Sequence, residues 1–259
     1  GIGREMAEQL AVSGVQHLVL SSRSAAKCNA VADTCRSLNP ACRLTVLPVN
    51  VTDTDSLEQA VQAIANMHGV TWWPLDMVVM NAGVGQLLPA LETDAATTEH
   101  IVRSNALWPM ILTPLLFAKA TPSTLSSEQS PSQQSPHLVI TSSIAGKLAV
   151  PLSAAYAASK FAIQGYFSSL ACERPDLRID LLCPGPVDTE FHRNSKNNDS
   201  ENADAPTAPS KMKMPVDRCV ALMLSAMQRN RNRQQQLQSL LQSLLQPLQF
   251  QEVWIALQP

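Results

Sequence analysis

The sequence predicts an α/β protein built around a parallel β-sheet. Short runs of β-branched residues and leucine alternate with longer segments of helical periodicity, which is the pattern of βαβ units. The run MVVM at 77–80 is apolar throughout, as expected for a strand that is covered on both faces. With 259 residues, of which 45 % are hydrophobic, the chain can form one large domain with a buried core.

The elements follow one another in a regular order. Strands are predicted at 17–21, 43–49, 77–80, 137–141, 178–182 and 252–256. Helices are predicted between them at 25–38, 55–68, 98–117, 153–172 and 216–228. Thr52 or Asp53 is expected to cap the helix that begins at Asp55.

Three polar segments interrupt this alternation. The segment 121–136 is rich in Ser, Gln and Pro, which predicts a disordered surface insertion, and 194–209 is a second polar loop. The segment 230–249 is a Gln/Leu low-complexity sequence with leucines at helical spacing, so it could extend the preceding helix. We favour a repeat expansion without function over a partner-binding or membrane-surface helix, because its polar face carries glutamine rather than Lys or Arg.

Composition argues against several functional classes. A net charge of −2 and an aromatic content of 4 % disfavour a nucleic-acid-binding protein, which normally has a basic face and rings for base stacking. The six cysteines form no CxxC pair and have no histidine at zinc-ligand spacing, so no metal site is predicted. Cys28 and Cys35 are instead expected to fill the interior side of a helix. No apolar run approaches the roughly 20 residues that a bilayer-spanning helix needs.

The strongest chemical signal is the pair Tyr156 and Lys160, which have YxxxK spacing on a predicted helix. Residues four apart share one helix face, so the phenol and the ammonium group would face the same cleft. A nearby cation favours the phenolate form of tyrosine, which helps proton transfer near neutral pH. The spacing alone also fits a surface pair on a helix.

Ser143 strengthens this signal, because it lies at the end of a predicted strand thirteen residues before the tyrosine. Ligands bind at the carboxyl ends of strands in open parallel sheets. A serine hydroxyl there can donate a hydrogen bond to an oxyanion that develops beside the tyrosine. Without Tyr156, a turn or cap residue would be the preferred interpretation of Ser143.

These motifs together resemble the short-chain dehydrogenases/reductases, and the resemblance runs over almost the whole chain. It rests on the ordered motifs GIG at 1–3, NAG at 81–83, RSNALWP at 103–109, SSIAGKLAVP at 142–151, AAYAASKFAIQGYF at 154–167 and PG at 184–185. DRCVALML at 217–224 and the final EVWI suggest the branch that contains dehydrogenase/reductase member seven and 11β-hydroxysteroid dehydrogenase-like enzymes. The resemblance implies a single NAD(P)-binding domain over 1–259, with a Rossmann-like, doubly wound parallel sheet.

The resemblance also implies roles for individual residues. Tyr156 would be the general acid in reduction and the base in oxidation, and Ser143 would orient the substrate carbonyl or alcohol. Lys160 would hold the nicotinamide ribose, and Asn105 would hold a water molecule in a proton relay. The residues expected along the cofactor are Gly1, Ile2, Gly3, Ser22, Arg23, Asn50, Val51, Asn81, Ala82, Gly83, Tyr156, Lys160, Pro184, Gly185, Val187 and Thr189.

The end of the second family strand indicates which cofactor is bound. NAD sites usually place an acidic residue there to bind the ribose 2′-hydroxyl, but this chain has Ser21, Ser22, Arg23 and Ser24. Arg23 could pair with a 2′-phosphate, assisted by Ser22 and Arg4, so NADP(H) is favoured over NAD(H). Where family members usually have Asp beside the adenine, this chain has Asn50, whose amide can still form a hydrogen bond.

A larger departure from the family lies at the chain's beginning. The family's first strand and the residues before Gly-Ile-Gly are missing, which would leave two strand edges unpaired. The chain expressed on its own is therefore expected to be poorly folded and inactive. Any targeting or membrane segment would lie outside 1–259, so a cytoplasmic and an endoplasmic-reticulum-associated location both stay open, as does a homodimer.

Three functions were weighed from the sequence. The favoured one is an NADP(H)-dependent oxidoreductase acting on a hydrophobic alcohol or carbonyl compound that is steroid-, retinoid- or lipid-like. The second is a non-catalytic NADP(H)-binding or scaffold protein, which the intact set of Asn105, Ser143, Tyr156 and Lys160 disfavours. The third is an interaction protein that uses the Gln/Leu segment.

Overall fold

The structure is a computed structural model that describes residues 1–68, 75–117, 136–191, 195, 213–244 and 255–257, with side chains up to Arg231. The helices are α1 (Ile2–Val12), α2 (Ala25–Leu38), α3 (Thr54–His68), α4 (Ala95–Val102), α5 (Trp108–Phe117), α7 (Ala154–Glu173) and α8 (Val216–Leu244). The strands are β1 (His17–Leu20), β2 (Arg43–Val46), β3 (Met77–Met80), β4 (His137–Thr141), β5 (Arg178–Pro184) and β6 (Ile255–Leu257). The short helices are η1 (Ala90–Glu92), η2 (Arg103–Leu107) and η3 (Ile144–Gly146).

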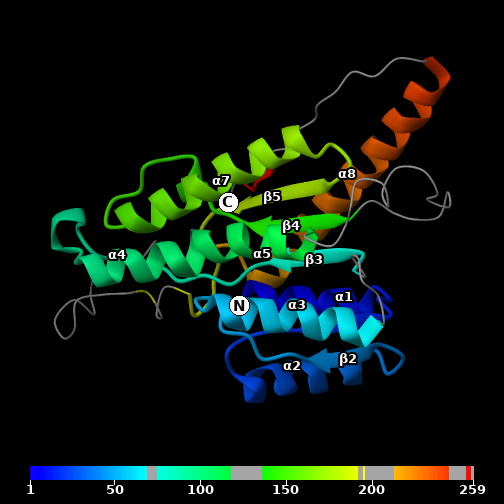
Figure 1. Cartoon of the computed structure of the whole chain (residues 1–259), viewed down its shortest axis with the longest axis horizontal. Helices are drawn as coiled ribbons and strands as arrows, with labels where there is room; N and C mark the ends of the chain where they lie inside the picture. The colour runs from blue at the N-terminus through cyan, green and yellow to red at the C-terminus, as the bar shows by residue number, and fades with distance from the viewer. Residues whose placement is uncertain (69–74, 118–135, 192–194, 196–212, 245–254, 258–259) are drawn as a thin grey trace.

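All strand pairs are parallel, but the strands form two sheets (Figure 1). One sheet has the order β1-β2, and the other has the order β3-β4-β5-β6. In the part of the chain that the structure describes, no strand joins β1 to β3. This break lies where the family resemblance predicts a further strand.

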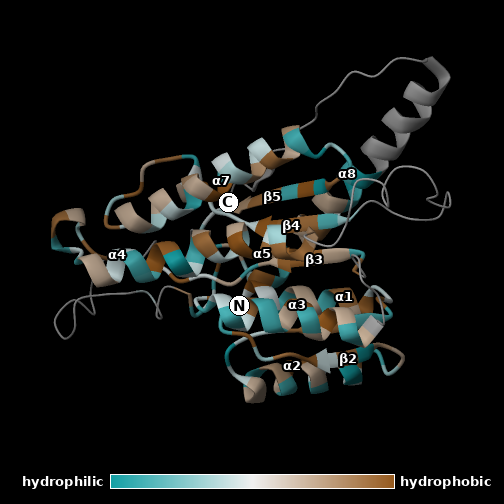
Figure 2. Cartoon of the chain, in the orientation of Figure 1, coloured by the Kyte–Doolittle hydropathy of each residue, from teal (hydrophilic) through white to brown (hydrophobic). Residues whose placement is uncertain are grey.

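Alternation along β4 directs side chains to two helical layers, as expected for a strand covered on both faces. Leu138 and Ile140 pack with α3, α5 and α7 on one face, whereas Val139 packs with α1 and α8 on the other. Figure 2 shows mostly hydrophobic residues along β3 and β4, and a mixture of hydrophobic and hydrophilic residues along the helices. The predicted doubly wound α/β class is therefore confirmed.

Helix α1 connects the two sheets. Met6 packs with α8 and the strands of the larger sheet, while Ala7 and Ala11 pack with Cys35 of α2. Cys28 and Cys35 are buried on α2, which confirms that these cysteines lie on the side of the helix that faces the protein interior.

Several predicted boundaries change in the structure. The helical stretch predicted at 98–117 is observed but begins at Ala95, and it consists of α4, the π-helical turn η2 and α5. Asp53, not Thr52, caps α3, because its carboxylate accepts a hydrogen bond from the amide of Asp55 at 3.2 Å. Helix α8 continues to Leu244, so residues 230–244 of the Gln/Leu segment extend the preceding helix, and 245–249 lie outside the described residues. The predicted insertions at 121–136 and 194–209 lie outside the described residues except for Pro136 and Ser195.

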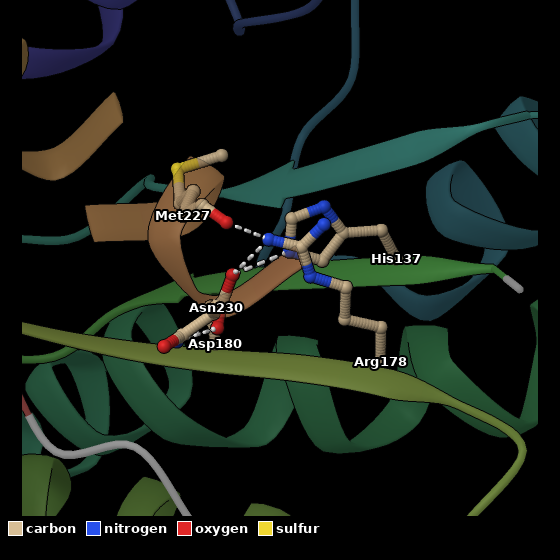
Figure 3. A network of polar contacts seen from close by, with 5 residues as sticks. All are labelled: His137, Arg178, Asp180, Met227 and Asn230. Atoms are coloured by element: carbon tan, nitrogen blue, oxygen red, sulfur yellow. Dashed lines mark hydrogen bonds and ion pairs between the residues drawn. The ribbon is translucent and has the colours of Figure 1, made fainter. Parts of the chain in front are cut away.

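A buried polar cluster fixes α8 to the amino-terminal end of the larger sheet (Figure 3). The Asp180 carboxylate accepts hydrogen bonds from His137 at 2.7 Å, from Asn230 at 2.8 Å and from Arg178 at 3.2 Å. The Arg178 guanidinium also donates to the carbonyl of Met227 on α8.

Among the described residues, no helix has the length and apolarity that crossing a membrane requires.

Candidate active site

The carboxyl ends of the larger sheet bring the predicted catalytic residues together. Ser143 follows the end of β4, and Tyr156 and Lys160 lie in the first two turns of α7. Asn105 lies in the π-helical turn η2 and is 1 % exposed. Since parallel strands end at the same edge, residues far apart in the sequence meet at one site.

Tyr156 and Ser143 are joined by a hydrogen bond between their hydroxyl groups. Lys160 is 4 % exposed, and its ammonium group lies 5.7 Å from the centre of the Tyr156 ring. The same ammonium group donates a hydrogen bond to the Thr141 carbonyl at 2.9 Å. The predicted sharing of one helix face by Tyr156 and Lys160 is therefore observed.

Burial decides the electrostatics of this pair. It raises the pKa of Tyr156 above its ordinary value, although the hydrogen bond with Ser143 opposes the rise. It also lowers the pKa of Lys160 to about 8. The effect expected from the sequence, a cation that favours phenolate, is thus outweighed in this structure by loss of solvent. At neutral pH the phenol carries its proton.

The Asn105 side chain is held entirely by protein groups. Its Oδ1 accepts from the Val84 amide at 2.7 Å, and its Nδ2 donates to the Val84 carbonyl at 2.9 Å and to the Ser159 hydroxyl at 3.1 Å. Ser159 in turn donates to the Tyr156 carbonyl at 2.6 Å. Asn105 therefore links the loop after β3 to the helix that carries Tyr156. The π-helical turn supplies the local irregularity at this point, as such turns often do at functional sites.

Close packing brings the loop after β3 against two other parts of the site. A Cβ atom at Gly83 would lie 2.9 Å from Asn105 Oδ1 and 3.8 Å from Lys160 Nζ. A Cβ atom at Gly3 would lie 2.7 Å from Asn81 Nδ2. A side chain at Gly83 would displace Asn105, whose amide is held by three hydrogen bonds, whereas at Gly3 the end of the Asn81 side chain would have to shift.

Two of the predicted cofactor residues, Gly1 and Thr189, lie close together at the start of α1. Gly1 is the N-cap of α1 and makes no side-chain cap hydrogen bond, and a Cβ atom there would lie 3.8 Å from Thr189. The unpaired amides of this helix start are the donor type that binds phosphate groups. Together with the buried Lys160 beside Gly83, they fit a dinucleotide.

Other predicted cofactor residues have structural partners of their own. The Asn50 Oδ1 accepts hydrogen bonds from Thr52, at 2.9 Å from its hydroxyl and 3.3 Å from its amide. Ala82 accepts from the Trp108 indole at 3.3 Å, and Pro184 is the buried last residue of β5. Ile2, Val51 and Val187 pack against the core, with Val187 buried. Gly185 follows directly after β5.

The residues expected to select NADP(H) lie at the end of β1. Arg23 is exposed, and Ser22 contacts the Ser24 carbonyl at 3.1 Å and the Cys28 sulfur at 3.1 Å. Arg4 pairs instead with Glu8 at 2.7 Å, so its assistance to Arg23 is not seen in the structure.

A family model for short chain dehydrogenases matches residues 1–200. The chain belongs to the short-chain dehydrogenase family. Proteins of this family interconvert alcohols and carbonyl compounds and bind nicotinamide dinucleotides.

Relatives of this short-chain dehydrogenase support the branch suggested by its sequence. It is 30 % identical over 264 residues to human dehydrogenase/reductase SDR family member 7, covering 100 % of this chain and 68 % of the relative. The mouse protein of that name is 32 % identical over 232 residues, covering 88 % and 64 %. Retinol dehydrogenase 8 from Bos taurus is 31 % identical over 195 residues, covering 74 % and 57 %. This short-chain dehydrogenase thus spans about two thirds of its member 7 relatives.

Solved structures agree on the fold. An alcohol dehydrogenase from Thermococcus sibiricus, complexed with 5-hydroxy-NADP, superposes with a TM-score of 0.71 at 20 % identity, covering 88 % of this chain and 86 % of the other. Levodione reductase gives 0.70 at 24 % identity, covering 86 % and 84 %. The Rossmann-like fold of this short-chain dehydrogenase is therefore shown.

The structure adds three residues that the sequence did not indicate. Gln86 reaches the start of α7, Ser159 connects Asn105 to the Tyr156 carbonyl, and the Phe191 ring lies 5.8 Å from the Tyr156 ring. Ser159 was readable within the YAASK motif, since it directly precedes Lys160. Gln86 and Phe191 come from loops, and no periodic pattern marks such positions.

Proposed function

We propose that this chain is an NADP(H)-dependent oxidoreductase that interconverts an alcohol and a carbonyl group on a hydrophobic small molecule. The observation that carries the proposal is the pairing of the Ser143 and Tyr156 hydroxyl groups beside the buried Lys160. Two hydroxyl groups at one point can both bind a single substrate oxygen, and one of them can transfer a proton to it.

Tyr156 acts as the acid in reduction. It donates its phenolic proton to the carbonyl oxygen, and Ser143 donates a hydrogen bond to the same oxygen. A bound nicotinamide cofactor supplies the hydride to the carbonyl carbon, or accepts it in the reverse reaction. In oxidation, the Tyr156 phenolate takes the proton from the alcohol. Because burial keeps the phenol protonated at neutral pH, the structure supports reduction as the favoured direction there.

Lys160 and Asn105 support this proton transfer. The Lys160 ammonium stabilises the negative charge that remains on Tyr156 after it has given up its proton. With a pKa of about 8, Lys160 is still mainly charged at pH 7. Asn105 fixes the loop after β3 to α7 through both hydrogens of its amide, so a relay water beside them would donate its hydrogen bond to an oxygen of Asn105.

The cofactor preference rests on Arg23. It is exposed at the end of β1, and no carboxylate stands among its neighbours Ser21, Ser22 and Ser24. A guanidinium at this place can bind a 2′-phosphate through charge-assisted hydrogen bonds. The likeness to an enzyme solved with 5-hydroxy-NADP supports a phosphorylated dinucleotide.

The substrate class is proposed to be steroid-, retinoid- or lipid-like. Phe191 sets an aromatic ring beside Tyr156, which suits an apolar substrate. The relative named retinol dehydrogenase 8 supports a retinoid within this class.

The Tyr156→Phe variant tests the reaction. Tyr166→Phe is the matched control, because the Tyr166 hydroxyl donates to the Met110 carbonyl at 3.2 Å and not to a catalytic residue. Full-length protein is assayed for NADPH consumption with a panel of retinal, ketosteroids and lipid aldehydes. We expect Tyr156→Phe to lose at least about 100-fold in kcat, since acid catalysis contributes about 10²–10⁴-fold, and Tyr166→Phe to keep its activity. Equal turnover by both variants would show that Tyr156 is not the acid.

The Arg23→Ala variant tests the cofactor. Loss of a charge-assisted hydrogen bond costs about 1.5–3 kcal/mol, so the KM for NADPH should rise by about 10-fold or more. The KM for NADH should change by less than about 3-fold, because NADH has no 2′-phosphate for Arg23 to bind. A parent protein that prefers NADH would contradict the assignment.

A further inference from the structure

The helix that carries Tyr156 begins without a side-chain cap of its own. The first amides of an α-helix have no partner within the helix and usually bind the N-cap side chain. Here the N-cap residue is Ser153, and its hydroxyl makes no such bond. The preceding residue, Leu152, has a φ of 62°, in the left-handed region that a leucine rarely adopts. The start of α7 therefore depends on groups from elsewhere in the chain.

Gln86 supplies the missing cap from the loop after β3. Its side-chain oxygen accepts a hydrogen bond from the Tyr156 amide at 3.0 Å. Tyr156 is the third residue of α7, the position whose amide an N-cap side chain normally binds. The Gln86 nitrogen donates to the Thr93 hydroxyl at 2.8 Å, which fixes the orientation of the amide. Gln86 is 4 % exposed, so water does not compete for these bonds.

Two further hydrogen bonds tie the same loop to the same turn. The Ser153 hydroxyl donates to the Gln86 carbonyl at 3.2 Å, which explains why it does not cap its own helix. The Leu88 amide donates to the Leu152 carbonyl at 2.9 Å and so helps to hold the strained residue. Segment 86–88 thus clamps the turn that leads into the catalytic helix.

We infer that Gln86 is a positioning residue for catalysis, which fixes the Tyr156 phenol relative to Ser143 by capping α7 at the backbone of Tyr156 itself. The inference rests on the proposed function, since it concerns the same proton transfer. The Gln86 side chain contacts neither the Tyr156 nor the Ser143 hydroxyl group, and it acts through the backbone of Tyr156.

The loop after β3 that contains Gln86 also contacts other residues of the active site. The loop also contains Val84, both of whose backbone groups bind Asn105, and Gly83, which packs near Lys160. One loop therefore holds two of the four catalytic groups, Asn105 and the backbone of Tyr156. A displacement of about 1 Å at a reacting group can cost about 100-fold in rate.

The test compares Gln86→Met, which keeps the side-chain length but removes both hydrogen-bonding groups, with Gln86→Glu, which keeps an acceptor for the Tyr156 amide. The matched control is Thr113→Val, which removes a buried hydrogen bond of 2.7 Å to Pro109 away from the start of α7. Full-length parent and variants are assayed for kcat, for the KM of NADPH and for the pH dependence of kcat, with the folded fraction measured by circular dichroism.

We expect Gln86→Met to lower kcat by 10-fold or more, an order taken from the cost of misplacing a reacting group, while the KM for NADPH changes by less than about 3-fold. Gln86→Glu should recover most of the loss, and Thr113→Val should keep the parent kcat. The pH profile of alcohol oxidation should move to higher pH in Gln86→Met, because a displaced phenol loses the Ser143 hydrogen bond that lowers its pKa.

Three outcomes separate the possible failures. If the parent is folded but shows no turnover, the proposed function fails. If the parent is active and Gln86→Met keeps its kcat and pH profile, or if Gln86→Glu is as impaired as Gln86→Met, the positioning role is overturned. If Gln86→Met does not fold, Thr93→Val replaces it, because that variant releases the Gln86 nitrogen and otherwise loses only the hydrogen bond from Thr93 to the Pro89 carbonyl; an unchanged kcat in Thr93→Val would then overturn the role.

Discussion

The two ends of the larger sheet each carry a buried polar cluster, and the two clusters treat charge in opposite ways. At the amino-terminal end, the Asp180 carboxylate faces His137, Arg178 and Asn230, and each donates a hydrogen bond to it (Figure 3). At the carboxyl-terminal end, the buried Lys160 ammonium donates to the neutral carbonyl of Thr141. In the described part of the chain, no carboxylate pairs with Lys160.

The pKa values reflect this difference. Burial alone would raise the pKa of Asp180, but the hydrogen bonds from His137 and Asn230 and the charge of Arg178 outweigh it and lower the pKa. For Lys160 burial prevails, and the pKa falls to about 8. The first cluster therefore stabilises its charge and holds α8 on the sheet. The cluster at the carboxyl-terminal end instead buries the Lys160 ammonium without a carboxylate partner, and catalytic sites often hold such charges at the expense of stability.

The largest effect on stability should come from Asp180→Asn. This change leaves the Arg178 guanidinium buried without a carboxylate, and removing one partner of a buried ion pair costs about 3–5 kcal/mol. We expect the free energy of unfolding in urea to fall by about 3 kcal/mol, while kcat per folded molecule stays at the parent value.

The exposed pair of Asp176 and Arg174 offers a matched control for that change. Its side chains are 44 % and 31 % exposed, so Asp176→Asn should cost less than about 1 kcal/mol. The comparison between the clusters would break down if Asp180→Asn were no more destabilising than Asp176→Asn, or if it reduced kcat as strongly as a catalytic variant.

A smaller effect of opposite sign is expected for Lys160→Met. The pKa of Lys160 is about 8 in the folded protein and near 10.5 in the unfolded chain, so its charge opposes folding fully below about pH 8. The shift corresponds to at most about 3 kcal/mol. We expect Lys160→Met to be more stable than the parent by about 2 kcal/mol at pH 7 but to have lost turnover.

The gain in stability should disappear as the pH rises from about 8 to 10.5, because the parent lysine then loses its charge in the unfolded chain as well. Thermal unfolding followed across this range measures the difference. Lys147→Met, at an exposed lysine, controls for the loss of one positive charge. A Lys160→Met protein that is less stable than the parent at pH 7 would show that the ammonium group has better compensation than its contacts suggest.

The sequence predicted one cluster and not the other, for a physical reason. Tyr156 and Lys160 have a fixed spacing on one helix, and Ser143 ends a strand with a clear apolar pattern, so local periodicity was enough to bring them together. His137, Asp180 and Asn230 come from two strands and a distant helix, and only the tertiary packing reveals that they meet. For the same reason Gln86 was missed, although it lies five residues after Asn81.

Irregular backbone is the other feature that sequence periodicity does not predict. The sequence predicted the helical stretch over 98–117 but not the π-helical turn within it, which adds a single residue to one turn. The turn nevertheless directs Asn105 toward Val84 and Ser159. Its presence was therefore not predictable, although the family motif did identify Asn105.

The smallest predicted effect concerns the acid stability of the amino-terminal cluster. Burial lowers the pKa of His137 below its ordinary value, so the folded protein keeps the ring neutral when the unfolded chain already binds a proton. Stability should therefore fall as the pH drops below about 6.5, the ordinary histidine value. His137→Gln removes the titrating group while keeping an amide that can donate to Asp180. Between pH 7 and pH 5, urea unfolding should show the parent losing about 1 kcal/mol more than this variant. Equal losses in the two proteins would mean that the charged imidazole is accommodated beside Asp180, and the cluster would then tolerate a second positive charge next to Arg178.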